Sequence, residues 1–187
     1  MRSSSSVFRR MIRVTSIGFA LAVLESGYAL AAQPTPVPYV APDFSSMNFL
    51  LGTWRCDDHQ AGRPGKRIEV DKYWIAYDGS QMQAHAVSPP FDKYRTRDEV
   101  EDTFTTYDPT IRLWINQYVD NFAGYGLSTS PGWIGDTLTW SWTNLDRTTG
   151  REVIMKISDA KTSFKDWGNN KRGQAMTVFL DGVCTKT

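Results

Sequence analysis

The sequence predicts an all-β protein: a single antiparallel up-and-down β-barrel of about 8–10 strands, preceded by a short helical turn. Three observations support this fold class. Apolar and polar residues alternate with a period of two in several short segments, turn-forming residues separate the segments, and one cysteine lies near each end of the strand-rich region. No stretch after Asn48 keeps helical periodicity for the ~11 residues of an average helix.

Six alternating segments follow one another along the chain. Turn chemistry such as Tyr77-Asp78-Gly79-Ser80 separates them, at a spacing typical of an antiparallel meander. The residues that share one face in each segment are Ile68, Val70, Trp74 and Ala76 (with Lys72 among them), Met82, Ala84 and Ala86, Leu113, Ile115, Gln117 and Val119, Leu138, Trp140 and Trp142, Val153, Met155 and Ile157, and Met176, Val178 and Leu180.

The sequence predicts three parts along the chain. Residues 1–31 are a secretory signal peptide, residues 32–47 are a proline-rich lead-in, and residues 48–187 form the barrel domain. The lead-in holds four prolines between Gln33 and Pro42, which favours an extended segment. Asp43–Asn48 is the expected helical turn.

Residues 1–31 have the features of a cleavable signal, although a buried N-terminal helix is the alternative. Val14–Leu24 is an apolar run of 11 residues, shorter than the ~20 that span a bilayer, and Ala29-Leu30-Ala31 is an A-x-A cleavage site. The positive n-region contains Arg2, Arg9, Arg10 and Arg13. We therefore expect export to the periplasm or secretion, with no membrane insertion after cleavage.

Cleavage would also change the charge of the protein. Without residues 1–31, the chain carries 17 Lys and Arg against 19 Asp and Glu, a net charge of −2, whereas the whole chain has +1. A weakly acidic protein without a basic run lacks the clustered Lys and Arg that bind phosphates. We therefore expect no nucleic-acid partner, and the sequence fits either a monomer or a dimer.

Cys56 and Cys184 both follow the predicted signal, and an even cysteine count in an oxidising compartment favours a disulfide. A bond between them requires the two ends of the domain to meet. An up-and-down barrel satisfies this requirement because its first and last strands pair. Two free buried thiols are the alternative. Neither cysteine has the nearby partners of a metal site, apart from His59.

Phe49-Leu50-Leu51-Gly52-Thr53-Trp54 resembles the start of the calycin barrels, the lipocalin, fatty-acid-binding and nitrobindin-like group. The resemblance is greatest to the bacterial DUF1579-type and nitrobindin-like branches, and Gly124–Trp133 also looks like a DUF1579-type segment. The resemblance implies structural roles for Gly52 and for Trp54, which would plug one end of the barrel. It also implies a basic partner for Trp54 on the last strand, either Lys186 or Arg172.

The chain departs from the nitrobindins at their haem ligand. Those proteins use a histidine near the C-terminal end of the barrel, whereas Gly173–Thr187 contains none, and His59 and His85 are the only histidines of the chain. We therefore expect no haem and no other cofactor.

Candidate site residues come from the aromatic and polar positions of the strands. Seven tryptophans suggest either a packed core or an apolar pocket with polar anchors such as Asn116 or Gln117. The predicted ligand-binding residues are Trp74, His85, Trp114, Asn116, Tyr118 and Trp140.

His85 is the one candidate for acid–base chemistry, with Glu99 or Glu101 to orient it. It shares a face with Gln81 and Gln83, opposite Met82. If the Met82 face is the core, His85 points to solvent; a polar-lined cavity would instead place it inside. The sequence therefore assigns no catalytic residue beyond this candidate.

Asp57-Asp58-His59 offers oxygen and imidazole ligands to a divalent metal. Two adjacent acids in a strand point to opposite faces, however, so we interpret the segment as a solvated polar one and predict no metal.

Three functions compete. The preferred one is an exported barrel that binds a small apolar or amphipathic molecule. The second is a small barrel enzyme, an isomerase, cyclase or lyase that uses His85; whether the protein is an enzyme stays open, with binding favoured. The third is a protein-binding inhibitor of a secreted hydrolase. A hollow barrel would favour the first two over the third.

Overall fold

The computed structural model describes residues 39–90, 96–144, 147–169 and 173–187. The predicted signal peptide and most of the lead-in therefore lie outside the described residues. No helix in these ranges is long and apolar enough to cross a membrane.

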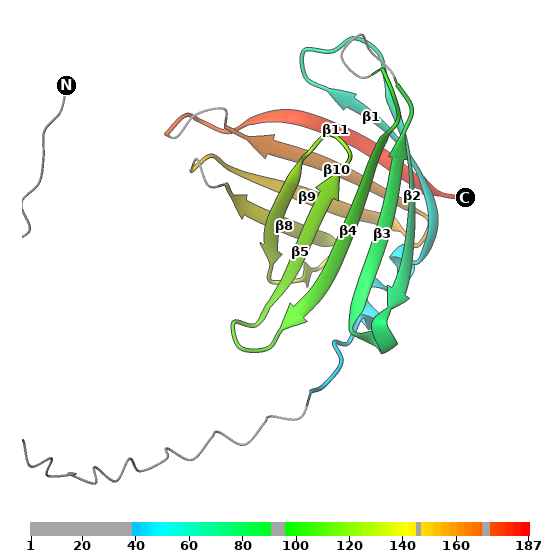
Figure 1. Cartoon of the computed structure of the whole chain (residues 1–187), viewed down its shortest axis with the longest axis vertical. Coiled ribbons are helices and arrows are strands. Elements are labelled where there is room, and N and C mark those ends of the chain that lie inside the picture. Colours follow the sequence, from blue (N-terminus) through cyan, green and yellow to red (C-terminus); the bar gives the residue numbers. More distant parts are fainter. Residues whose placement is uncertain (1–38, 91–95, 145–146, 170–172) are drawn as a thin grey trace, which may run out of the picture. The chain divides into compact units, whose positions relative to one another are not determined.

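The described chain is almost entirely β-structure (Figure 1). A 3-10 helix, η1 (Ser45–Leu50), leads into the barrel, and a second short one, η2 (Tyr77–Gly79), joins two strands. The strands are β1 (Gly52–Gln60), β2 (Arg67–Ala76), β3 (Gln81–Ser88), β4 (Glu99–Asp108), β5 (Leu113–Asp120), β6 (Tyr125–Ser130), β7 (Trp133–Ile134), β8 (Thr137–Thr143), β9 (Thr149–Ser158), β10 (Lys161–Gly168) and β11 (Thr177–Lys186).

The sheet closes on itself, which confirms the predicted fold class. Neighbouring strands pair antiparallel in chain order, β1 pairs with β11, and β6 pairs with β8. Within the described residues this gives a closed barrel of 10 strands, with the two-residue β7 as an addition. In Figure 1 the green strands β2–β5 form one wall, and β8–β11, coloured from olive to red, form the wall opposite.

A disulfide joins Cys56 of β1 to Cys184 of β11, as predicted. The two residues are direct partners in the β1–β11 register, and both are buried. The bond therefore links the two strands whose pairing joins the start of the barrel to its end. A buried disulfide is compatible with an oxidising compartment.

Trp54 fills one end of the barrel. It is 1% exposed, and its indole nitrogen donates a hydrogen bond of 2.6 Å to the Leu50 carbonyl oxygen, which ties β1 to η1. The Lys186 ammonium lies 5.6 Å from the Trp54 ring and donates to the Phe49 carbonyl oxygen at 2.8 Å. Of the two basic partners implied by the calycin resemblance, Lys186 therefore holds the position, and Arg172 lies outside the described residues.

Gly52 is required at the entry to β1. Its φ of +107° is in the left-handed region, and a Cβ there would lie 3.2 Å from the Lys186 side chain. The glycine thus lets the chain turn from η1 into the barrel beside Lys186.

The hydrophobic core lies around Trp54 at this end of the barrel. It combines residues of η1 with residues from both walls, and Met47, Trp54 and Leu138 are its most deeply buried large members. The buried members are Phe44, Met47, Leu50, Trp54, Cys56, Met82, Trp114, Leu138, Trp140 and Cys184.

Three strands present the opposite face from the one that apolar patterning favours. In β5 Val119 is 49% exposed, whereas Asn116 and Tyr118 line the cavity. In β2 the apolar residues Ile68, Val70 and Trp74 are 37–41% exposed, whereas Arg67 and Asp71 are buried. In β9 Met155 and Ile157 are more than half exposed, and Glu152 lines the interior. The apolar faces of these strands therefore lie outside, because the barrel interior in this region is polar.

Candidate functional site

The barrel is hollow. A cavity of about 850 Å³ lies inside it, and residues from all ten barrel strands and from η1 line it. This volume is within the range of small-molecule sites in proteins. The chemistry of the lining differs between two regions.

The apolar region adjoins the core around Trp54. It consists of large side chains from η1, β1, β3, β8, β9 and β10, so that part of the cavity wall is also the core surface. Its main members are Met47, Leu50, Trp54, Met82, Leu138, Trp140, Ile154 and Phe164.

The polar region is rich in acids. Arg67 is the only cation among the described residues that line the cavity. The acids of the lining are Glu69, Asp71, Glu99, Glu101, Asp120, Glu152 and Asp166.

Arg67 is held by three carboxylates. Its Nε lies 3.1 and 3.0 Å from the two oxygens of Asp58, a residue with no exposed surface. Its terminal nitrogens reach Glu99 at 3.1 Å and Glu69 at 3.0 Å, and the Ser88 hydroxyl donates to the same Glu69 oxygen at 2.7 Å. Burial opposes the charge of Arg67, but Glu69 and Asp58 outweigh it and raise the pKa of Arg67. The guanidinium is therefore permanently charged, and each of its three nitrogens contacts a carboxylate.

Burial raises the pKa values of the acids around this network. It raises the pKa of Asp58 to about 6, against the lowering effect of Arg67. It raises the pKa of Asp166 to about 7. Burial, and then the charges of Glu69 and Glu152, raise the pKa of Glu101 to about 8. Part of this acid cluster therefore stays protonated near neutral pH, because the protein supplies too little positive charge for all of it.

Two further acids of the cluster, Asp71 and Glu152, also have raised pKa values. The pKa of Asp71 is raised well above its ordinary value by burial, followed by the charges of Glu69 and Glu101. That of Glu152 is raised by burial, followed by the charge of Asp166, its direct partner in the β9–β10 register. Among the described residues, neither Glu101 nor Glu152 has an ion pair or a hydrogen bond with a protein donor.

The structure places three of the six predicted ligand-binding residues in the cavity lining: Asn116, Tyr118 and Trp140. Asn116 accepts a hydrogen bond of 2.9 Å from the Thr105 hydroxyl. Trp114 is buried but packs at the closed end, with ring-centroid distances of 5.1 Å to Phe44 and 5.3 Å to Tyr107.

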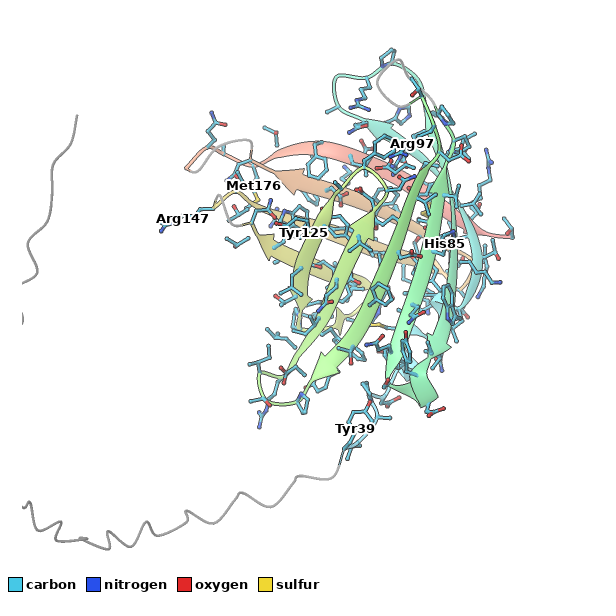
Figure 2. All side chains as sticks on the ribbon, viewed as in Figure 1. Tyr39, His85, Arg97, Tyr125, Arg147 and Met176 are labelled. Atoms are coloured by element: carbon cyan, nitrogen blue, oxygen red, sulfur yellow. A yellow bond between two sulfur atoms is a disulfide. The ribbon has the colours of Figure 1, made fainter. Side chains whose placement is uncertain are left out.

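Trp74 and His85 do not belong to the cavity lining. Trp74 is 37% exposed on the outer face of β2. His85, on β3 (Figure 2), lies on the outer face because its neighbours Met82 and Ala84 point inward and are buried. Its ring nitrogen Nδ1 is 2.7 Å from the Asp102 carboxylate. The predicted pairing with Glu99 or Glu101 is therefore wrong: both line the cavity, and the outward-facing Asp102, which follows Glu101, meets His85.

Asp57, Asp58 and His59 separate as alternation requires, but the prediction of a solvated segment is wrong for Asp58, which has no exposed surface. Asp58 points inward to Arg67, whereas Asp57 pairs with Arg55 at 3.2 Å outside. His59 lies in a second hollow of about 440 Å³ on the outer surface, which Arg55, Met155, Trp167 and Val183 also line. These three residues therefore do not converge on a metal.

Only one group of potential metal ligands within 4.8 Å of one another occurs in the described residues. It consists of Asp71, Cys56 and Cys184. Both cysteines are in the disulfide and offer no thiolate.

Sequence reasoning missed the acidic cluster. The signal was present: Arg67, Glu69 and Asp71 alternate in β2, and Glu99 and Glu101 alternate at the start of β4. In both strands the polar positions repeat with a period of two, but polar faces are ordinarily assigned to solvent. A polar interior is indicated only when several strands of the same barrel each have such a polar face.

Comparisons with known proteins support the fold and leave the family open. No protein-family model matches the chain, and no curated protein has a significantly similar sequence. Among solved structures, the barrel is similar to that of the S-type phycobiliprotein lyase CPES from Guillardia theta. The similarity has a TM-score of 0.54 at 9% identity and covers 78% of this chain and 98% of the lyase. At this identity, the likeness shows a shared calycin-like barrel alone, and the DUF1579-type resemblance stays a prediction.

Proposed function

We propose that this chain is an exported protein that binds a small amphipathic molecule inside its barrel. The observation that carries the proposal is the 850 Å³ cavity, whose lining is apolar beside Trp54 and acidic around Arg67. A molecule with one apolar and one polar end would satisfy both regions at once. The similarity to a lyase barrel is consistent with a ligand-holding interior.

Binding is favoured over acid–base catalysis by the position of His85. A general base must reach the substrate, and His85 is on the outer face, away from the cavity lining. Export is supported by the signal-like sequence of residues 1–31 together with the buried disulfide.

The test compares two adjacent residues of β3. Ala86 lines the cavity, whereas Val87 alternates to the outer face. We expect saturable binding of decanol in isothermal titration calorimetry, near one molecule per chain. The variant Ala86→Phe, which fills part of the cavity, should weaken binding by about tenfold or more, and Val87→Phe should leave it unchanged. Absence of saturable binding, or equal loss in both variants, would contradict the proposal.

A further inference from the structure

Asp71 is a buried carboxylate without a hydrogen-bond donor. It lies on β2, is 7% exposed and lines the cavity. Its Oδ1 has no hydrogen-bond partner among the described residues. Its Oδ2 is 3.4 Å from Cys56 Sγ, but that sulfur is in the disulfide and has no proton to donate. A buried carboxylate of this kind is costly unless a donor or a cation reaches it.

Further acids lie level with Asp71 on the same wall. Asp71, Ala86, Glu101 and Asp120 are successive register partners on β2, β3, β4 and β5. Neighbouring strands are ~4.8 Å apart, and the small Ala86 leaves the space between Asp71 and Glu101 open. The carboxylates therefore border one part of the cavity.

The other wall contributes Glu152 and Asp166, which are direct partners on β9 and β10. The charge of Glu152 raises the pKa values of both Asp71 and Glu101, so the two walls interact across the cavity. The nitrogens of Arg67 contact Asp58, Glu69 and Glu99, and among the described residues Arg67 forms no ion pair with Asp71, Glu101 or Glu152.

We propose that the amphipathic ligand is an organic ammonium ion, held with its charged end between Asp71, Glu101 and Glu152 and its apolar end against the apolar side chains of the cavity lining. This inference rests on the proposed function and names the chemical class of its ligand. An ammonium ion would supply the positive charge and, if it carries hydrogens, the donors that Asp71 lacks.

An organic cation fits the site better than a metal ion. No three of these carboxylates offer oxygens within 4.8 Å of one another among the described residues, so they are too far apart for one small ion. Trp140 is the direct register partner of Glu152, and its ring is part of the cavity wall. An aromatic ring beside a carboxylate is a favourable environment for an alkylammonium group.

Binding of a cation should depend on pH. The ligand favours the ionised carboxyls, so binding releases the protons that the empty barrel holds. The titratable and charged groups that face the site are Asp58 on β1, Arg67, Glu69 and Tyr73 on β2, Glu99 and Glu101 on β4, Tyr118 and Asp120 on β5, Glu152 on β9 and Asp166 on β10. Affinity for a cation of fixed charge should therefore rise from pH 6.0 to pH 8.5.

The experiment compares three probes with the same alkyl chain: decyltrimethylammonium, decanol and decanoate. Each is titrated into the full protein by calorimetry at pH 6.0 and 8.5, the two ions below their micelle concentrations and decanol below its solubility limit. At pH 8.5 the cation should bind about tenfold or more tightly than decanol, and decanoate more weakly than either. Titrations in two buffers of different ionisation enthalpy should show proton release for the cation and none for decanol.

Variants of inward-facing and outward-facing acids distinguish binding at the proposed site from a nonspecific effect of the protein's charge. Asp71→Asn and Glu101→Gln should each reduce the ratio of the cation's affinity to the affinity for decanol. Asp102→Asn removes an acid of the same wall that faces outward, and it should leave this ratio unchanged. If decanol binds but the cation has no advantage, or if the advantage survives both inner variants, the inference is overturned while the proposed function stands. If none of the probes binds, both are overturned.

Discussion

Asp58 and Arg67 are direct partners in the β1–β2 register, and their side chains meet inside the barrel at 3.0 and 3.1 Å. Asp58 has no exposed surface, and Arg67 is 8% exposed. The pair is an ionic contact within the interior, and Glu69 and Glu99 complete it. Arg67, the cation of the cavity lining, is thus paired with these acids. The remaining acids can be neutralised only by protons or by a ligand.

Removal of Arg67 should be strongly destabilising. In Arg67→Met, three buried or half-buried carboxylates would lose their partner, which in buried pairs costs about 3–5 kcal/mol. We expect this loss in the free energy of unfolding from urea denaturation. Arg55→Met is the matched control, because Arg55 pairs with Asp57 on the outer face and is 46% exposed. Equal effects of the two substitutions would contradict the network's role.

The protein should become less stable as the pH rises from about 5 to 9. The pKa values of Asp58, Asp166 and Glu101 are raised from 3.8, 3.8 and 4.5 to about 6, 7 and 8. The folded state therefore holds protons that the unfolded chain has already released, so the free energy of unfolding decreases with pH in this window. Thermal melts across the window measure the effect.

Glu101→Gln should reduce this pH dependence. The variant has no carboxyl to ionise at that position, so at pH 8.5 we expect it to be more stable than the parent by roughly 1–3 kcal/mol. At pH 5 the two should differ little. Asp102→Asn, on the outer face, serves as the control and should keep the parental pH profile. A parental slope in Glu101→Gln would show that Glu101 is not one of the titrating groups.

The disulfide should contribute substantially to stability. Cys56 and Cys184 are separated by 128 positions, and chain-entropy arithmetic for so long a loop gives about 5 kcal/mol. We expect a loss approaching this value in the double variant Cys56→Ser/Cys184→Ser, measured by urea denaturation. The parent protein in strong reductant should match the variant, and a parent insensitive to reductant would argue that the bond is absent in solution.

Lys186 should stabilise the closed end of the barrel. In Lys186→Met, the hydrogen bond to Phe49 and the contact with the Trp54 ring are both lost, at a cost of about 1–2 kcal/mol. Lys161→Met changes an exposed lysine of the adjacent β10 and should cost less than about 0.5 kcal/mol. Equal losses in the two variants would contradict this role of Lys186.

Ligand contact with Trp140 should be visible by fluorescence. A brominated alkyl alcohol quenches tryptophans that it touches, and Trp140 lines the cavity whereas Trp74 lies outside. We expect Trp140→Phe to reduce ligand-dependent quenching and Trp74→Phe to leave it unaltered. The reverse result would place the ligand on the outer surface.

The sequence by itself determined the closed barrel. Period-two alternation, the turn residues between segments and the two terminal cysteines together predicted an antiparallel meander with paired ends, and the β1–β11 pairing with the Cys56–Cys184 bond confirms it. The calycin resemblance of Phe49–Trp54 implied that Trp54 plugs one end of the barrel, and Trp54 is buried there.

Only the tertiary structure decided which face of each strand is inside. In β3 and β8 the apolar face points inward, but in β2 and β9 it points outward. Alternation shows that a strand has one polar and one apolar face. It does not show which face points inward, because the same pattern occurs in a strand whose polar face lines a cavity. Asp71, Glu101, Glu152 and Asp166 come from four strands far apart in the sequence. Their shared cavity exists only once the sheet closes. Closure turns the inward faces of these strands toward one another and excludes the water that would otherwise solvate each acid.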